Sequence, residues 1–207
     1  GGNEFQSGRN LQPRLYLNEN GSFQFNEKAF PVLEEQFNSI AVADVNADGF
    51  PDVFFGSGVE YETFGRSPKS YLLVNQKDNT FIDDTKHYFS SHELGMIRDA
   101  KFSELNNDGL PELIIVGHFM PIEIYELQDN TFEKLNISAL EKSNGLWNTI
   151  HLMDMDKDGL TDIFIGNFGT NTKLKASVEN PIRLRINDFN QNRSQESILT
   201  YFKNGRE

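Results

Sequence analysis

Residues 40–56 read IAVADVNADGFPDVFFG. Asp44, Asn46 and Asp48 stand at positions 1, 3 and 5 of a loop, Gly49 follows at position 6, and Asp52 stands at position 9 before an apolar run. Oxygen side chains at this spacing can point toward one centre, as they do around a hard cation such as Ca²⁺. Glycine at position 6 permits the backbone reversal that turns the carbonyl of position 7 toward the same centre.

The pattern recurs as FSELNNDGLPELIIVG at 102–117 and as HLMDMDKDGLTDIFIG at 151–166. A motif that repeats within one chain indicates a repeat architecture. The three copies predict three calcium loops, with the main-chain carbonyl of position 7 as one ligand. The expected ligands are Asp44, Asn46, Asp48, Phe50 and Asp52; Glu104, Asn106, Asp108, Leu110 and Glu112; and Asp154, Asp156, Asp158, Leu160 and Asp162.

The chemistry of the donors favours calcium over other metals. All are oxygen ligands, with no His or Cys, which argues against zinc and copper. Ten carboxylates, three in each of the first two loops and four in the third, would repel one another without a cation. The EF-hand is excluded because its position 12 is Glu, whereas this chain has Phe55, Ile115 and Ile165 there. A turn of Asp, Asn and Gly without metal remains the alternative for each loop.

A fourth, weaker metal candidate is NDFNQNRSQES at 187–197. Arg193 replaces the turn glycine, and only two carboxylates remain, so the site is expected to be degenerate. Its ligands would be Asp188, Asn190, Asn192, Ser194 and Glu196.

A second repeated element alternates with the loops. LYLNENGSF at 15–23, YLLVNQKDNTF at 71–81 and IEIYELQDNTF at 122–132 each predict a strand, a polar turn and a Phe. SALEKSN at 138–144 is the only stretch that suggests a helical turn. The strands are expected near 38–44, 52–56, 70–75, 80–83, 97–103, 112–117, 121–127, 131–135, 147–153, 162–166, 182–187 and 197–203.

These strands predict an all-β chain, a β-propeller or propeller fragment of about four four-stranded blades with calcium-binding loops between strands. Residues 1–207 would form a single propeller-type domain that is part of a larger propeller, or else a smaller closed ring. We expect a partial blade at 1–30, blades at 31–86 and 87–135, and a blade plus the start of the next at 136–207. Open strand edges of such a fragment favour self-association.

Composition excludes several classes of function. The net charge of −12, without clustered Lys or Arg, argues against nucleic-acid binding. The chain has no Cys, so it holds no disulfide and no thiol nucleophile, and no segment is apolar enough for a membrane-spanning helix. No nucleophile elbow or phosphate-binding loop occurs, and the four His residues show no metal-binding spacing.

The segment SGVEYETFGRSPKS at 57–70 lengthens the first complete repeat. In a repeat array such an insertion usually forms a loop on one face. Exposed aromatic residues beside Arg are typical of recognition surfaces, and an ordinary loop packed by its own aromatic residues is the alternative. The candidate partner-binding residues are Tyr61, Phe64, Arg66 and Lys69.

The runs at 44–56, 104–117 and 154–166 resemble the FG-GAP/VCBS repeat family. The resemblance implies an integrin-α-like β-propeller that binds calcium. GSG, GHF and GNF stand where part of the family has Gly-Ala-Pro, which is more similar to the bacterial VCBS type.

The resemblance implies a calcium-stabilised binding or cell-adhesion module of a secreted or cell-surface protein, one that recognises protein or glycan. The location would be extracellular, periplasmic or the outer cell surface, where calcium is abundant. The alternative is a carbohydrate-active enzyme domain, a lyase or glycosidase, although most paired carboxylates belong to the metal loops. No catalytic residue is assigned.

Overall fold

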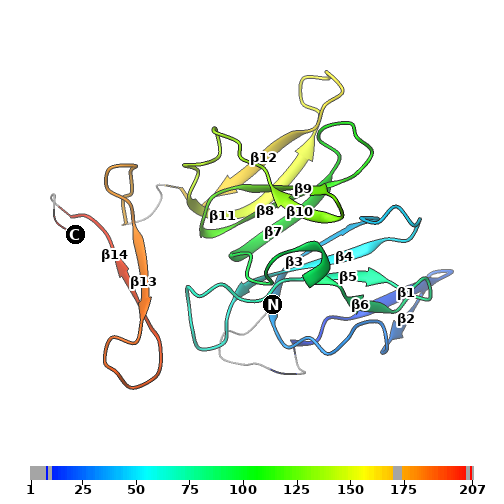
Figure 1. The fold of residues 1–207 in the computed structure, drawn as a ribbon, viewed down its shortest axis with the longest axis horizontal. Coiled ribbons are helices and arrows are strands. Elements are labelled where there is room, and N and C mark those ends of the chain that lie inside the picture. The colour runs from blue at the N-terminus through cyan, green and yellow to red at the C-terminus, as the bar shows by residue number, and fades with distance from the viewer. Residues whose placement is uncertain (1–7, 9–10, 170–173, 204–205, 207) are drawn as a thin grey trace.

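A computed structural model describes residues 8, 11–169, 174–203 and 206 of the 207-residue chain. Nearly all of its regular structure is β-strand (Figure 1). Among the described residues, no helix has the length and apolar character needed to cross a membrane. The elements are β1 (Leu15–Glu19), β2 (Ser22–Asn26), β3 (Gln36–Ala43), β4 (Asp52–Val59), β5 (Tyr71–Asn75), β6 (Phe81–Asp83), α1 (Thr85–Tyr88), β7 (Met96–Ser103), β8 (Glu112–Met120), β9 (Glu123–Gln128), β10 (Thr131–Lys134), β11 (Gly145–Met153), β12 (Asp162–Asn167), β13 (Arg183–Asn187) and β14 (Glu196–Thr200).

Strands β3 to β6 form an antiparallel sheet in which each strand pairs with the next one in the sequence. Strand β4 is buried along nearly its whole length, which explains why its sequence is an apolar run rather than an alternation. Its side chains still alternate between faces, so Val53 and Phe55 join one core cluster and Phe54 joins another. The sheet is therefore covered on both sides.

Strands β7 to β10 repeat this order, and β8 is buried in the same way as β4. Strand β11 pairs with the far end of β8 through Gly145 and Leu146, and β12 pairs with β11. These contacts join β7 to β12 in one six-stranded sheet. Strands β3 and β7 are in contact, as are β7 and β11, so the first strands of successive units lie next to one another.

Two hairpins lie at the sides of this body (Figure 1). Hairpin β1–β2 and hairpin β13–β14 each form a separate two-stranded sheet. The first contacts the β3–β6 sheet through Leu15, which packs on the cluster of Val53, Phe55 and Leu73. The second contacts the segment 57–70, where the Ser197 hydroxyl donates a hydrogen bond to the Phe64 carbonyl.

Three apolar clusters fill the spaces between successive layers. One lies between the β3–β6 sheet and strands β7 to β10, and it includes Phe54, Leu72, Leu113 and Phe132. A second lies between β8 and β11–β12 around Ile114 and Ile150. The third lies between hairpin β1–β2 and the β3–β6 sheet. Repeats that bury their faces against neighbours produce this layered core.

The predicted strands agree with the structure, which places a strand at each of the twelve expected positions, and the all-β class is confirmed. Two expectations differ. The segment 138–144 forms hydrogen-bonded turns with no helix, whereas the short helix α1 at Thr85–Tyr88 was not expected. Of the expected four blades, only β3–β6 and β7–β10 have four strands among the described residues, because no further hairpin pairs with β12 or β14.

Candidate metal-binding loops

Each acidic loop connects two antiparallel strands that pair with each other. The loop residues 44–51 join β3 to β4, 104–111 join β7 to β8, 154–161 join β11 to β12, and 188–195 join β13 to β14. In the first three cases, these are the first and second strands of a repeat unit. The loop is therefore a fixed part of the repeat.

All four loops have the same backbone shape. Position 4 has a positive φ in each of them, between 56° and 64°, at Ala47, Asn107, Lys157 and Gln191. Position 6 also has a positive φ, from 86° to 90° at the three glycines and 72° at Arg193. Glycine adopts this conformation without steric cost, so the sequence pattern and the geometry agree. Arg193 adopts it too, although its side chain disfavours it.

Carboxylates at position 1 organise the turn. The Asp44 oxygens accept hydrogen bonds from the N–H groups of Asp48 at 3.0 Å and Gly49 at 2.7 Å. Asp154 accepts the equivalent pair at 3.2 and 2.9 Å, and Asp188 at 3.0 and 2.8 Å. These hydrogen bonds hold the loop without any metal, as the alternative interpretation requires.

Glu104 replaces Asp at position 1 of the second loop and keeps this role. Its Oε2 accepts the Gly109 N–H at 2.6 Å, and its Oε1 accepts the Asn106 and Asn107 N–H groups at 3.1 and 2.7 Å. The longer side chain therefore reaches more donors in the turn. Its length does not displace the loop from the common shape.

The carboxylate at position 9 joins the end of the loop to its beginning. Asp52, Glu112, Asp162 and Glu196 each accept the N–H of position 2 at 2.6 to 3.0 Å. Asp52 also accepts the Asn75 N–H from β5 at 2.9 Å, which ties the loop to the outer hairpin of its sheet.

Burial changes the electrostatics of two of these carboxylates. Burial raises the pKa of Asp52, hydrogen bonds from Asn75 and Val45 oppose it, and Asp48 and Asp44 raise the pKa further. Burial likewise raises the pKa of Glu112, the Leu105 N–H opposes it, and Glu104 adds to the increase. The ionised forms lack sufficient compensating positive charge, which a bound cation would supply.

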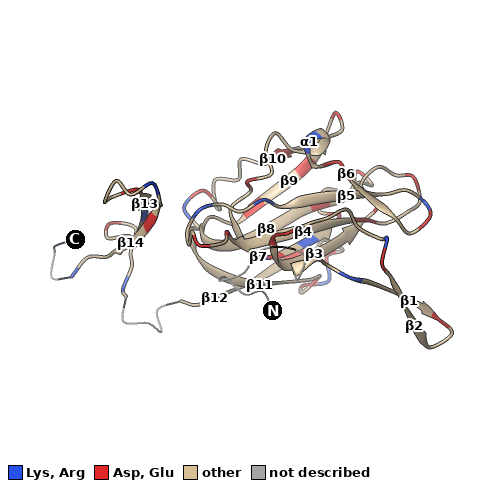
Figure 2. Cartoon of the chain, turned by 90° about the horizontal axis from the view of Figure 1, so that it is seen from below, with Lys and Arg blue, Asp and Glu red and all other residues tan. Residues whose placement is uncertain are grey.

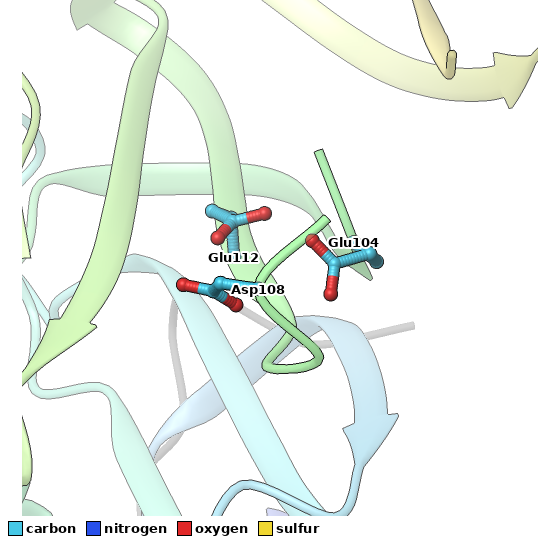
Figure 3. Close-up of side chains that lie close together, drawn as sticks. All are labelled: Glu104, Asp108 and Glu112. Atoms are coloured by element: carbon cyan, nitrogen blue, oxygen red, sulfur yellow. The ribbon is translucent and has the colours of Figure 1, made fainter. Parts of the chain in front are cut away.

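The structure brings carboxylates together in the second and third loops. Glu104, Asp108 and Glu112 form one group, and Asp154, Asp156 and Asp162 form another, each with ligand atoms within 4.8 Å of one another. Figure 3 shows the first group, with Glu104 and Glu112 on either side of the turn that carries Asp108. Clustered carboxylate oxygens are the donors that Ca²⁺ takes in proteins, so the residues fit this ion.

The first loop differs because a lysine reaches it. Lys77 Nζ, from the turn of β5–β6, lies 3.4 Å from Asp48 Oδ2 and 5.4 Å from the centre of the Phe50 ring. Within the described part of the chain, the three carboxylates of this loop do not form a group like the other two. Calcium binding here, through Asp44, Asn46, Asp48, Phe50 and Asp52, stays a prediction.

In the fourth loop, amide side chains add to the hydrogen bonds of the two carboxylates. Asn190 Nδ2 donates to Glu196 Oε1 at 2.8 Å, and Asn192 Oδ1 accepts from the Ser194 N–H at 2.8 Å. No group of three acidic side chains forms in this loop, as far as the described residues show. The weaker metal site predicted here stays a prediction, in a loop of the same shape with fewer carboxylates.

Position 7 contributes its N–H to the turn. The N–H groups of Phe50, Leu110 and Leu160 donate to the position 5 carboxylates at 2.8 to 2.9 Å. Their carbonyls remain predicted ligands. In Figure 2, acidic segments recur in the loops, whereas Lys and Arg are scattered along the chain.

The segment 57–70 borders a pocket of about 250 Å³. Tyr61, one of the four candidate partner-binding residues, lies in its wall, and the side chain is exposed. Arg66 Nε lies 3.2 Å from Glu60 Oε2, and Lys69 forms a β-bridge with Glu93. The lining residues are Leu11, Glu34, Glu35, Gln36, Val59, Glu60 and Tyr61.

Apart from Tyr61, the residues that line this pocket were not predicted from the sequence. Burial raises the pKa of Glu35, nearby Lys69 opposes the increase, and Glu60 and Glu34 add to it. The acidic pair at 34–35 was the only local signal, and nothing in the sequence showed that it faces the insertion. Phe64 lies elsewhere, with its ring 6.3 Å from that of Phe119.

The fold and the loops together define an all-β repeat protein in which each acidic loop joins a pair of antiparallel strands. A family profile described as FG-GAP-like repeat matches residues 5–55 and 104–165, which together make up more than half of the chain. The chain therefore belongs to the FG-GAP-like repeat family, and the resemblance seen in the sequence is confirmed. The matched regions contain the first three acidic loops. A comparison with curated proteins found no match.

Proposed function

We propose that this protein is a calcium-stabilised binding module built from propeller blades. The observation that carries the proposal is the common hydrogen-bonded shape of the four loops, two of which gather three carboxylates each. Calcium held by these loops would fix the link between the two strands of each pair. Its role would be structural, because the loop connects strands and the buried carboxylate at position 9 faces the loop itself.

Thermal unfolding tests the calcium role. A site that binds only the folded state stabilises it by about 2.7 kcal/mol when free calcium is 100 times the dissociation constant. The variant Asp156→Asn keeps the Oδ1 that accepts the Asp158 N–H but removes one charge of the third group. It should lose part of the calcium-induced rise in melting temperature, whereas Glu133→Gln on the exposed side of β10 should keep it. Identical melting curves in saturating calcium and in excess chelator would contradict the proposal.

The packing of the sheets supports a propeller arrangement. Antiparallel sheets pack face to face through the three apolar clusters, and β3, β7 and β11 are neighbours. We propose that these strands line the axis of a propeller and that β5–β6 and β9–β10 lie on its outside. Membership of the FG-GAP-like repeat family supports this arrangement.

An extracellular, periplasmic or outer cell-surface location suits this role. The carboxylates of the third-loop group and Asp108 of the second-loop group are exposed, and calcium outside cells is abundant enough to fill sites of modest affinity. In such a place the module would act in binding or adhesion, with a protein or glycan as its ligand.

The pocket beside the insertion is the proposed ligand surface. Three glutamates, Glu34, Glu35 and Glu60, would repel an acidic polysaccharide and attract a basic side chain. A protein ligand that presents Lys or Arg to Tyr61 fits this lining better than an acidic glycan does.

An array of basic and acidic peptides and of polysaccharides, probed in calcium, tests the ligand class. Tyr61→Ala should weaken binding about tenfold or more, since exposed aromatic anchors commonly contribute this much. Tyr201→Ala, which removes an exposed tyrosine that does not line the pocket, should not. Cleavage of an array component without stable binding would instead support a carbohydrate-active enzyme.

A further inference from the structure

Three hairpins of this chain are variants of one element. In β5–β6 Asn75 lies opposite Phe81, in β9–β10 Leu127 lies opposite Phe132, and in β1–β2 Asn18 lies opposite Phe23. The phenylalanine therefore stands at the same place in each hairpin. Hairpin β1–β2 is thus equivalent to the outer half of a four-stranded unit.

The two other hairpins complete a unit, and this one does not. Strand β5 pairs with β4, with Leu73 opposite Val53, and β9 pairs with β8, with Tyr125 opposite Leu113. Strand β1 pairs with β2 and with no other strand in the described part of the chain. Among the described residues its second edge is therefore unpaired, and an open strand edge favours the addition of another strand.

The exposure of Phe23 supports the same conclusion. Phe81 packs on Phe30, in the segment before β3, with ring centres 5.2 Å apart, and Phe132 stacks on Phe89, before β7, also at 5.2 Å. Both phenylalanines are buried, whereas Phe23 is 67% exposed. Among the described residues, no apolar segment buries Phe23 as Phe30 helps to bury Phe81.

The third unit, β11–β12, lacks among the described residues the outer hairpin that the first two units have. Strand β12 pairs with β11 and, among described residues, with no outer hairpin. Its sequence Asp-Ile-Phe-Ile repeats the buried starts of β4 and β8, yet Phe164 is 40% exposed. The segment before β11 carries Leu135, Ile137 and Leu140, which are only partly buried on the Ile114–Ile150 cluster.

We propose that hairpin β1–β2 of one molecule completes the third unit of a second copy by pairing β1 with β12. The register of the complete units places Tyr16 opposite Ile163 and Leu15 opposite Phe164. Asn18 would then donate its N–H to Asp162, as Asn75 donates to Asp52. Phe23 would cover Leu135, Ile137 and Leu140.

A second copy is the occupant because one molecule cannot make this contact within itself. Hairpin β1–β2 and strand β12 lie at opposite sides of the body in two perpendicular views (Figures 1 and 2), and Leu15 anchors the hairpin to its own β3–β6 sheet. Hairpin β13–β14 is a poorer occupant, because its acidic loop makes it equivalent to the inner pair β3–β4. The contact is head-to-tail, so it extends into chains of molecules or closes into a ring.

Cysteine cross-linking tests the register, since the chain has no cysteine of its own. Residues opposite each other in an antiparallel pair have Cα atoms about 4.5 to 5.5 Å apart, within the range for a disulfide. An oxidised mixture of Tyr16→Cys and Ile163→Cys molecules should give a covalent dimer. The mixture of Tyr16→Cys with Val178→Cys, which replaces a residue that is 73% exposed, should give none.

Sedimentation of the uncross-linked chain in saturating calcium gives a second measurement. The wild-type chain should associate as its concentration rises, and Phe23→Ser should weaken association about tenfold, whereas Val178→Ser should not. Circular dichroism shows whether each variant is folded. A chain that stays monomeric at all concentrations, or a monomer with an internal disulfide in the Tyr16→Cys, Ile163→Cys double variant, would overturn the proposal. Neither result depends on whether a peptide or glycan ligand is found.

Discussion

Lys77 Nζ lies 3.4 Å from Asp48 Oδ2, so a positive charge from the outer hairpin of the first sheet reaches the acidic loop between β3 and β4. Desolvation raises the pKa of Asp48, but hydrogen bonds from the Phe50 N–H and Lys77 together outweigh it and lower the pKa. In this structure, the lysine is the cation nearest this loop carboxylate. A metal ion bound in this loop would therefore compete with the lysine for the same carboxylate.

Replacing this lysine should strengthen calcium binding in the first loop. Lys77→Met removes the competing charge from an exposed ion pair, which water screens, so the fold should lose little stability. The calcium affinity of the first loop should rise about two- to fivefold in isothermal titration. Lys134→Met, which removes a similarly exposed partner of Glu123 outside the loops, serves as the control and should leave calcium affinity unchanged. A weaker first site in Lys77→Met would show that the lysine supports the loop.

The effect of pH on stability should reverse when calcium is added. Burial raises the pKa of Asp52 and Glu112 above their ordinary values of 3.8 and 4.5. The metal-free folded state then binds more protons than the unfolded state just above these values, so stability falls as the pH rises through the raised pKa values. With calcium bound, the ionised carboxylates are needed, and acidification should destabilise the protein.

Melting temperatures from pH 4 to 8, in calcium and in chelator, measure this reversal. The chelated protein should melt at a higher temperature near pH 5 than near pH 7. The variants Asp52→Asn and Glu112→Gln report the pH dependence that comes from all other groups, and this is subtracted. Parallel curves in the two conditions would contradict the assignment of these carboxylates to a cation site.

A further pH effect should be independent of calcium. The pKa of Glu35 is raised by burial at the pocket, with Lys69 opposing the increase. Ionised Glu35 therefore destabilises the folded state at pH 7, and this penalty is absent below the ordinary pKa of 4.5. Glu35→Gln should raise the melting temperature at pH 7 by the same amount with calcium as with chelator, and Glu34→Gln, at an exposed position, should change it less.

The strands and the loops were predictable because their signals are local. The apolar runs after Asp52, Glu112 and Asp162 end each loop, and the alternation of polar and apolar residues in 15–23 defines a hairpin. Chain spacing also held a signal that the four-blade prediction did not use: the distance from Asp154 to Asp188 is too short for the outer hairpin found between earlier loops.

Contacts between distant segments account for what was not predicted. Lys77 approaches Asp48 only because β5–β6 folds back beside β4, and Glu35 faces Glu60 only after the sheet forms. No repeating pattern in the sequence indicates either of these contacts. A lysine contacts the first loop and three carboxylates gather in the second, and this difference depends on tertiary structure, because the two ligand patterns are nearly identical.

Core packing predicts a large difference between two neighbouring phenylalanines. Phe54 is fully buried between the sheets, with its ring 6.1 Å from that of Phe89, while Phe50 in the loop is 39% exposed. Phe54→Ala should lower the free energy of unfolding by about 3 to 5 kcal/mol, because it leaves a cavity between two rigid layers. Phe50→Ala should cost less than about 1 kcal/mol in urea denaturation. A similar loss for both would mean that the two sheets do not pack as described.

Arg193 gives the sharpest test of the common loop shape. It holds φ at 72°, where the other three loops have glycine at 86° to 90°. A residue with a Cβ pays about 1 to 2 kcal/mol in this region, and glycine loses about 0.5 to 1 kcal/mol more chain entropy on folding. Arg193→Gly should therefore stabilise the β13–β14 hairpin by roughly 0.5 to 1 kcal/mol, seen as slower amide exchange at Leu184 and Ile198. Arg185→Gly, within β13, is the matched control and should destabilise the hairpin. Faster exchange in Arg193→Gly would show that the arginine side chain, and not the backbone shape, holds the fourth loop.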